Sequence, residues 1–232
     1  MRDKCKRALG LALVLVLAAQ SAAAQQVDAR PTLTPGQVGS FAAAGAMIGL
    51  GVFLDTKGGA APCAPCDPQT VPAFDRWMIR PPVQGFSRAS DLLLLGLAGG
   101  TLVHGTTSAS GWSGTVVSLE AAAWTMGITQ LSKVIIARER PVLYTADAAS
   151  VADQIKNQRS MPSGHTSIAF ALATSYWVNN PDVGIAPKIL AVVGATGVGV
   201  LRVAAAKHFP SDVVVGAVVG TATALIVHEI RF

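Results

Sequence analysis

The stretch RSMPSGHTSIAFALATSYWV, Arg159 to Val178, places a polar turn directly before a long apolar run. Ser163 is a favoured helix N-cap, and Gly164 lets a ligand approach the backbone closely. The free N–H groups of a first helical turn attract anions. We therefore predict a helix that begins at Ser163 or Gly164 and presents His165 at its mouth. Taken alone, the tetrapeptide PSGH also fits an ordinary capped helix with an incidental histidine.

Apolar segments recur along the chain between polar or Gly/Pro-rich breaks. They cover residues 38–54, 92–103, 116–137, 167–178, 189–206 and 213–227. None alternates between apolar and polar residues as a strand does, and their Gly and Ala content allows close helix packing. The pattern predicts an all-α fold, a helical bundle of about six helices with an active site at one rim. Several segments are shorter than the roughly 20 residues of a usual membrane crossing.

The composition narrows the class of protein. Of the 232 residues, 51% are hydrophobic and only 13% are charged, which is too apolar for an average soluble domain. The net charge is +5, but the basic residues are scattered and no aromatic platform for stacking bases accompanies them. We therefore expect no nucleic acid as a partner. Anionic phosphates, lipid head groups and a membrane fit the charge better.

The N-terminus has the pattern of a secretory signal. Four basic residues precede the apolar core LGLALVLVLAA, and the small residues of SAAAQ offer a cleavage site after Ala24. We predict a signal peptide over residues 1–24, a linker over residues 25–37 and a single helical domain over residues 38–232.

The longest break between apolar segments is predicted as a structured loop over residues 55–91. It contains several prolines and the pair Cys63 and Cys66 in APCAPCD. No second ligand pair completes a zinc site, and an exported chain favours a disulfide between these two cysteines.

A second polar group follows the segment that ends near residue 137. In KVIIARERP, Lys133 and Arg140 are two helical turns apart, so we expect them to share one helix face at a spacing of about 10 Å, with Pro141 ending the helix. Arg138 is expected to point elsewhere, as a snorkelling surface charge. Judged alone, Lys133 and Arg140 also fit snorkelling surface charges.

A third polar group, RVAAAKHFPSD, contains Arg202, His208 and Asp212. Pro210 suits the first position of the last helix, which places Asp212 in its first turn. From there the carboxylate can accept from one imidazole nitrogen of His208 and leave the other free to attack. Alone, Asp212 also fits an acid that complements the helix dipole.

Together the three groups fall at the ends of consecutive helices, which a bundle can bring to one rim. They supply cations, helix-terminal amides and two histidines, but no cluster of carboxylates for a metal. This inventory predicts a phosphate-transfer site that works without a metal ion.

The motifs also resemble a known family signature. They are Lys133-x6-Arg140-Pro141, Pro162-Ser163-Gly164-His165 and Arg202-x5-His208-x3-Asp212. Their combination is similar to the three-part signature of the type 2 phosphatidate phosphatase superfamily, which also includes bacterial acid phosphatases and vanadium haloperoxidases. The combination is specific for the superfamily and says little about the substrate.

The resemblance implies a role for each matching residue. His208 would be the nucleophile that forms a phosphohistidine, Asp212 would orient it, and His165 would protonate the leaving alcohol or phosphate. The phosphoryl oxygens would be held by Lys133, Arg140, Ser163, Gly164 and Arg202. The family usually has serine before the arginine of the third motif, where this sequence has Leu201. We expect altered support of Arg202 rather than lost activity.

The resulting functional expectation is a bacterial membrane-associated phosphatase without metal or cofactor. Its substrates would be lipid phosphate monoesters or diphosphates. The alternatives are a soluble exported acid phosphatase of broad specificity, a vanadium haloperoxidase and a non-enzymatic lipid-binding membrane protein. Neither the head group nor the oligomeric state follows from the sequence.

The order of the segments indicates on which side of the membrane the active site lies. If segments 92–103 and 116–137 cross as a hairpin, the cysteine loop and the catalytic loop lie on the same side. A disulfide needs an oxidising compartment, so we expect an inner-membrane protein with its active site in the periplasm, or alternatively a soluble periplasmic protein. A cleaved signal leaves Gln25 outside, so this orientation requires segment 38–54 to pack against the bundle without a complete crossing.

Three further titratable residues lie in or near apolar segments. His104 and His228 have no companions in the motifs and are predicted to be structural. Glu120 needs a partner within the bundle if it lies at membrane depth.

Overall fold

Six α-helices and five short 3-10 helices make up the regular structure of residues 33–232, the part of the chain that the computed structural model describes. The α-helices are α2 (Pro35–Asp55), α3 (Gln84–Thr106), α4 (Gly111–Ile136), α5 (Gly164–Asn179), α6 (Ile185–Ala204) and α7 (Pro210–Arg231). The 3-10 helices are η1 (Pro68–Thr70), η2 (Arg76–Met78), η3 (Pro141–Tyr144), η4 (Ala148–Val151) and η5 (Ile155–Gln158). Each predicted apolar segment corresponds to one α-helix, and no strand occurs in residues 33–232, which confirms the all-α prediction. The predicted signal peptide and most of the predicted linker lie outside the described residues.

Two predicted boundaries are wrong. The linker does not extend to Gln37, because Thr34 caps α2: its hydroxyl accepts from the Gln37 N–H, the Gln37 side chain accepts from the Thr34 N–H, and Pro35 occupies the first helical position. The cysteine loop does not extend to residue 91, because α3 begins at Gln84. The first two turns of α3 are polar since they face the active site, and this polarity hid the helix from the hydropathy pattern.

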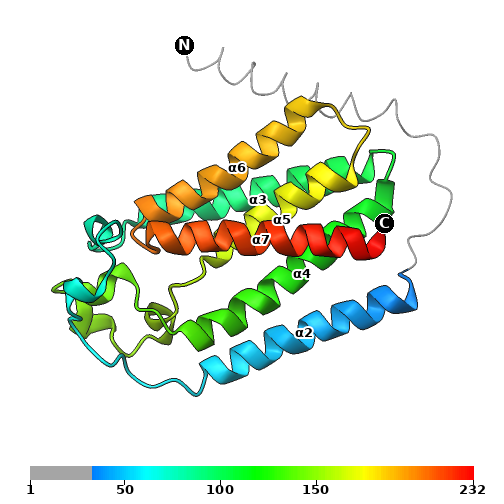
Figure 1. Cartoon of the computed structure of the whole chain (residues 1–232). Coiled ribbons are helices and arrows are strands. Elements are labelled where there is room, and N and C mark those ends of the chain that lie inside the picture. Colours follow the sequence, from blue (N-terminus) through cyan, green and yellow to red (C-terminus); the bar gives the residue numbers. More distant parts are fainter. Residues whose placement is uncertain (1–32) are drawn as a thin grey trace, which may run out of the picture. The chain divides into compact units, whose positions relative to one another are not determined.

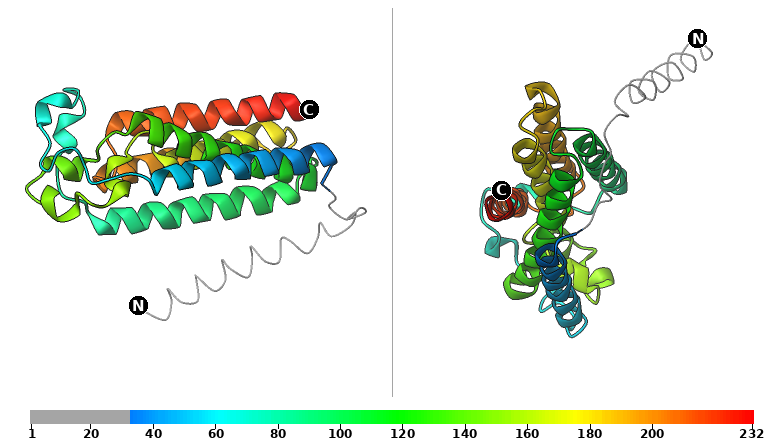
Figure 2. Two further views of the ribbon diagram at one scale, coloured as in Figure 1. Left: turned by 90° about the horizontal axis from the view of Figure 1, so that it is seen from below. Right: turned by 90° about the vertical axis from the view of Figure 1, so that its right-hand side faces the viewer.

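The helices form a bundle with α5 at its centre (Figures 1 and 2). This helix contacts α3, α4, α6 and α7, while α2 lies on the outside against α4. The α5–α7 contact is the closest: a Cβ on Gly220 would lie 2.0 Å from the Ser167 carbonyl oxygen, and one on Gly216 would lie 2.8 Å from the Ser163 carbonyl oxygen. Glycine at these two positions lets the start of α7 lie directly beside the start of α5.

One end of the bundle carries both long connections. The C-terminal ends of α4 and α6 and the N-terminal ends of α5 and α7 meet there, beside the loops over residues 56–83 and 137–163 (Figure 1). The two loops pack on each other: Cys63 and Cys66 form a disulfide, and the Cys66 N–H donates to the Leu143 carbonyl at 2.8 Å. Val71 and Met78 are buried with Phe209 at the start of α7. The cysteine loop and the catalytic loop therefore lie at the same end.

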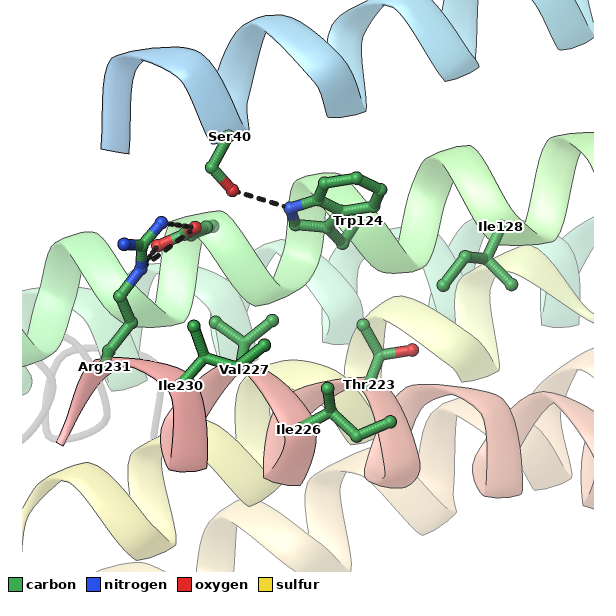
Figure 3. A pocket seen from close by; sticks show the side chains of 9 residues that line it. Ser40, Trp124, Ile128, Thr223, Ile226, Val227, Ile230 and Arg231 are labelled. Carbon is green, nitrogen blue, oxygen red and sulfur yellow. Dashed lines mark hydrogen bonds and ion pairs between the residues drawn. The ribbon is translucent and has the colours of Figure 1, made fainter. Parts of the chain in front are cut away.

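The opposite end is held by polar contacts among three helices. Arg231 at the end of α7 donates to the buried Glu120 of α4 at 2.9 Å, and Trp124 Nε1 donates to Ser40 Oγ of α2 at 2.8 Å. Figure 3 shows Arg231 and Trp124 beside a cavity of about 270 Å³ between these helices. Glu120 therefore has the partner that its depth in the bundle requires.

Four helices, α2, α3, α6 and α7, are long and apolar enough to cross a membrane. Their outward faces expose large apolar side chains such as Leu92, Leu190 and Ile230. The prediction that segment 38–54 falls short of a crossing is wrong in length: α2 has 21 residues, about 31 Å of helix, and runs along α4 between the two ends of the bundle (Figure 2).

Candidate active site

The start of α5 presents backbone amides without helical partners. Ser163 is the N-cap, and the first helical hydrogen bond runs from the Ser167 N–H to the Ser163 carbonyl, so the N–H groups of Gly164, His165 and Thr166 have no partner within the helix. The Ser163 side chain does not cap these groups; it accepts from the Thr166 hydroxyl at 3.0 Å. The predicted helix start is thus confirmed, with its amides open to a ligand.

Lys133, in the last turn of α4, lies beside this helix start. A Cβ on Gly164 would be 3.4 Å from Lys133 Nζ. Glycine at this position therefore leaves room for the ammonium group next to the open amides, and the two can neutralise the same anion.

Arg140 reaches the same region by a different route from the predicted one. Helix α4 ends at Ile136 because Ala137 adopts a left-handed conformation, with φ 47°, so Lys133 and Arg140 do not share a helix face. The Arg140 N–H donates to the Asn157 carbonyl at 2.7 Å, and Pro141 begins η3. Both side chains nevertheless line one cavity, so the cations converge although the predicted geometry is wrong.

His208 is buried in the turn between α6 and α7, with its tautomer fixed by the backbone. Its Nδ1 lies 2.8 Å from the Ser160 carbonyl oxygen, which can only accept a hydrogen bond. Nδ1 therefore carries the proton, and Nε2 holds the free lone pair. Nε2 is the nitrogen available to attack phosphorus.

Asp212 supports His208 indirectly. It lies in the first turn of α7, as predicted, but its Oδ2 is 3.7 Å from His208 Nδ1, too far for a hydrogen bond. The carboxylate instead accepts from the Ser160 hydroxyl at 2.5 Å and from the Phe209 N–H at 2.8 Å. Asp212 thus fixes the residue whose carbonyl holds His208.

Arg138 is part of this network, and its prediction as a snorkelling surface charge is wrong. Its guanidinium donates to Asp212 at 2.7 Å and to Asp75 at 2.8 Å, and it lies over the Phe209 ring at 4.4 Å. Both carboxylates are fully buried. The left-handed turn at Ala137 redirects the side chain inward, which helical periodicity did not anticipate.

His165 and Arg202 share a partner that the sequence did not indicate, Asp91 of α3. His165 Nε2 lies 2.8 Å from Asp91 Oδ1, and Arg202 Nη1 lies 3.5 Å from the same oxygen. The ring of His165 is 36% exposed, so it remains accessible to a leaving group.

Two serines of α3 support Arg202. Its Nη1 lies 3.2 Å from Ser90 Oγ and 3.4 Å from Ser87 Oγ. The motif position before Arg202 is Leu201 instead of the usual serine, so this support comes from a different helix. The polar spacing of α3, QGFSRASD, is the signal from which it could have been found.

Burial and positive charge determine the protonation of the site. Burial lowers the pKa of His208 to about 3; Asp212 opposes this shift, and Arg140 and Arg202 add to it. Burial and the nearby Arg202 lower the pKa of Arg140 to about 10. At neutral pH the imidazole is uncharged and the guanidinium is still a cation, the pairing that an attack on a phosphate requires.

A family model described as PAP2 superfamily matches residues 114–232. The chain belongs to this superfamily. The comparisons with curated proteins and with solved structures find no match. PAP2 superfamily members are phosphatases, so the chain is a phosphoric ester hydrolase in the general sense that the family supports.

The matched region contains all three motifs but not every residue of the site. Asp75 and Asp91 lie before residue 114, on the cysteine loop and on α3. In this PAP2 superfamily member, elements outside the family match therefore position Arg138, His165 and Arg202.

The remaining histidines lie at the opposite end of the bundle. His104 Nδ1 lies 2.7 Å from the Tyr176 hydroxyl, and His228 Nδ1 lies 2.7 Å from the Asn179 side-chain oxygen. Each one therefore joins two helices and is distant from the catalytic motifs.

Proposed function

We propose that this PAP2 superfamily member is a metal-independent phosphatase of lipid phosphate monoesters or diphosphates that works through a phosphohistidine. The observation that carries this proposal is the tautomer of His208. Its Nδ1–H is held by the Ser160 carbonyl, so the lone pair of Nε2 belongs to a buried, uncharged imidazole surrounded by cations.

The reaction proceeds in two steps. His208 Nε2 attacks phosphorus, the bond from phosphorus to the leaving oxygen breaks, and His165 supplies a proton to that oxygen. Water then attacks the phosphohistidine and releases inorganic phosphate and free His208. Asp91 holds His165 in place for both steps, because the acid of the first step becomes the base of the second.

The phosphoryl oxygens are neutralised by protein groups. Lys133, Arg140 and Arg202 together with the open amides at Gly164 supply positive charge where the transition state develops negative charge. This is the part that a metal ion plays in other phosphatases, so we expect activity to survive a chelator.

An apolar groove beside His165 supports a lipid substrate. It has a volume of about 270 Å³ and is lined by residues of three helices: Ile48, Val52, Met126, Thr129, Gln130, Gly164, His165 and Ile168. A hydrocarbon chain in this groove would place the leaving oxygen near the general acid. The four candidate membrane helices would bring the groove to a bilayer.

The disulfide supports an oxidising compartment for the active site. Cys63 and Cys66 lie at the same end as the motifs, so the site would face the periplasm of a bacterial inner membrane.

Phosphate release from a panel of lipid phosphates, with EDTA present throughout, tests the activity. A labelled activated aryl phosphate tests the intermediate. The leaving group of this substrate needs little protonation, so His165→Ala should still accumulate phosphoenzyme. His208→Ala should form none. His104→Ala is the matched control, since it removes an imidazole far from the site. A phosphoenzyme in His208→Ala contradicts the assignment.

A further inference from the structure

A small polar cavity adjoins the residues that hold the scissile phosphate. It has a volume of about 170 Å³ and is lined by Asp55, Gln130, Lys133, Arg140, Lys156 and Arg159. Lys133 and Arg140 belong to the first motif. Lys156 and Arg159 belong to none of the three motifs, and the phosphatase reaction described above does not use them.

The charge of this cavity is strongly positive. Four cations face a single carboxylate, Asp55, which accepts from Arg159 Nε at 2.8 Å. In the described part of the chain, no carboxylate lies within ion-pair distance of Lys156 or Lys133. Arg140 Nε is buried and has no hydrogen-bond partner among these residues. Such a concentration of uncompensated cations favours a ligand with more charge than one phosphate carries.

Lys207 adds to this concentration from the turn before His208. Burial lowers the pKa of Lys207, and the next largest causes are the positive charges of Arg140, Arg202 and Lys156.

The cavity also adjoins the apolar groove beside His165. Gln130 lines the cavity on one side and the groove beside His165 on the other. Helix α2 closes this corner tightly, since a Cβ on Gly51 would lie 2.9 Å from Gln130 Cβ. A substrate with its chain in the groove and its terminal phosphate at His208 could therefore place a second anionic group in the cavity.

We propose that this cavity binds a second phosphate group and that the preferred substrate is a lipid diphosphate, an inference that rests on the proposed phosphatase function. His208 Nε2 forms a bond to the terminal phosphorus, and the bond from that phosphorus to the bridging oxygen breaks. The lipid monophosphate leaves with the electron pair, held by Lys156 and Arg159. Water then hydrolyses the phosphohistidine and releases inorganic phosphate and free His208.

The test compares two substrates with one hydrocarbon chain, farnesyl diphosphate and farnesyl monophosphate, in the full-length protein. Lys156→Gln removes one charge from an exposed position at the cavity, so the fold is preserved. We expect kcat/KM for the diphosphate to fall roughly 10- to 100-fold and that for the monophosphate to change less than about threefold, as the loss of one charge-assisted hydrogen bond predicts. Lys57→Gln is the control, since it removes the same charge from an exposed site outside the cavity and leaves both values unchanged.

The outcomes separate this inference from the phosphatase function itself. An equal loss on both substrates places Lys156 at the scissile phosphate and overturns the second site, as does an unchanged kcat/KM for both. In either case phosphate release by the wild-type protein leaves the phosphatase function intact. If the wild-type protein releases phosphate from neither lipid, the proposed function fails and the second site fails with it.

Discussion

Arg138 Nη2 donates to Asp75 Oδ2 at 2.8 Å, and this bond connects the loop after α2 to the turn that carries His208, the proposed nucleophile. Asp75 also accepts from the N–H and the hydroxyl of Ser211, while the other amino group of Arg138 donates to Asp212. The cysteine loop therefore fixes the first turn of α7. His208 is positioned at the end of this chain of contacts, through Asp212 and Ser160.

Removing the guanidinium group of Arg138 should lower both the stability of the protein and its catalytic rate. Arg138→Gln leaves Asp75 and Asp212 buried without their cation, and breaking a buried ion pair from one side costs about 3–5 kcal/mol of unfolding free energy. We also expect kcat to fall because Ser160 and His208 lose their fixed geometry. Thermal unfolding in detergent and initial rates measure the two effects, and Arg88→Gln, an exposed arginine on α3, should change neither.

A double-mutant cycle with Asp75→Asn tests whether the two residues act as one unit. Residues in one ion-pair network have coupling energies of about 0.5–3 kcal/mol, so the double variant should lose less than the sum of the two single losses. Strict additivity would mean that Asp75 and Arg138 stabilise the rim independently.

Gly164→Ala should reduce catalysis without reducing stability. The added Cβ would lie 3.4 Å from Lys133 Nζ and 3.7 Å from Thr129 Cγ2, so it occupies the space between the ammonium group and the open amides. We expect kcat/KM to fall about tenfold or more, as for the loss of a charged hydrogen bond, and the melting temperature to stay level or rise. Gly85→Ala in the first turn of α3 is the control because its Cβ would meet open space.

The fold could be predicted from the sequence because each helix has a long apolar run, and the helix starts at Ser163 and Pro210 have local signals. The eight motif residues could be proposed from the sequence for the same reason, since their spacing is local. Asp75 and Asp91 could not be found in this way. Their partners are more than sixty residues away in sequence, and only the packed bundle brings them to the rim.

Arg138 and Asp212 illustrate a second limit of sequence reasoning. Periodicity extrapolated α4 through Arg140, but a single left-handed residue, Ala137, changes the direction of every side chain after it. Likewise, the four-residue spacing of His208 and Asp212 suggested a direct hydrogen bond. The carbonyl of Ser160, a group that any residue provides, occupies that place instead.

The pH dependence of kcat should show no acid limb near the ordinary pKa of histidine. Burial lowers the pKa of His208 to about 3, so the nucleophile is deprotonated and competent at every pH above that value. With a saturating activated aryl phosphate, kcat should therefore stay level from pH 7 to pH 5. A midpoint near the ordinary value of about 6.5 would show that His208 is not desolvated in the active protein. With a poor leaving group the rate falls with rising pH as His165 loses its proton. Burial and the positive charge of Arg202 lower the pKa of His165, so this limb lies below the ordinary histidine value, and His165→Ala removes it.

The topology is the least expected consequence of the structure. Helix α2 is long enough to cross, and its first turn lies at the same end as Arg231, which donates to the Gly36 carbonyl at 3.4 Å. If α2 and α7 cross, residue 34 and the C-terminus share one side of the membrane, and the active site with Cys63 and Cys66 lies on the other. A cleaved export signal, a spanning α2 and a disulfide in an oxidising compartment therefore cannot all hold.

We predict that the disulfide and the active site are periplasmic and that residue 34 and the C-terminus are cytoplasmic, which requires that residues 1–24 do not act as a cleaved export signal. After mild reduction of intact bacterial cells, a thiol reagent that cannot cross the inner membrane should label Cys63 and Cys66. The Cys63→Ser/Cys66→Ser variant retains only Cys5 and gives the background.

A green fluorescent protein fused after Phe232 should fluoresce, because it folds in the cytoplasm. Protection of the cysteines until the inner membrane is opened would place the site in the cytoplasm. Labelled cysteines with a dark fusion, and a protein that stays in the aqueous fraction, would favour the soluble periplasmic alternative.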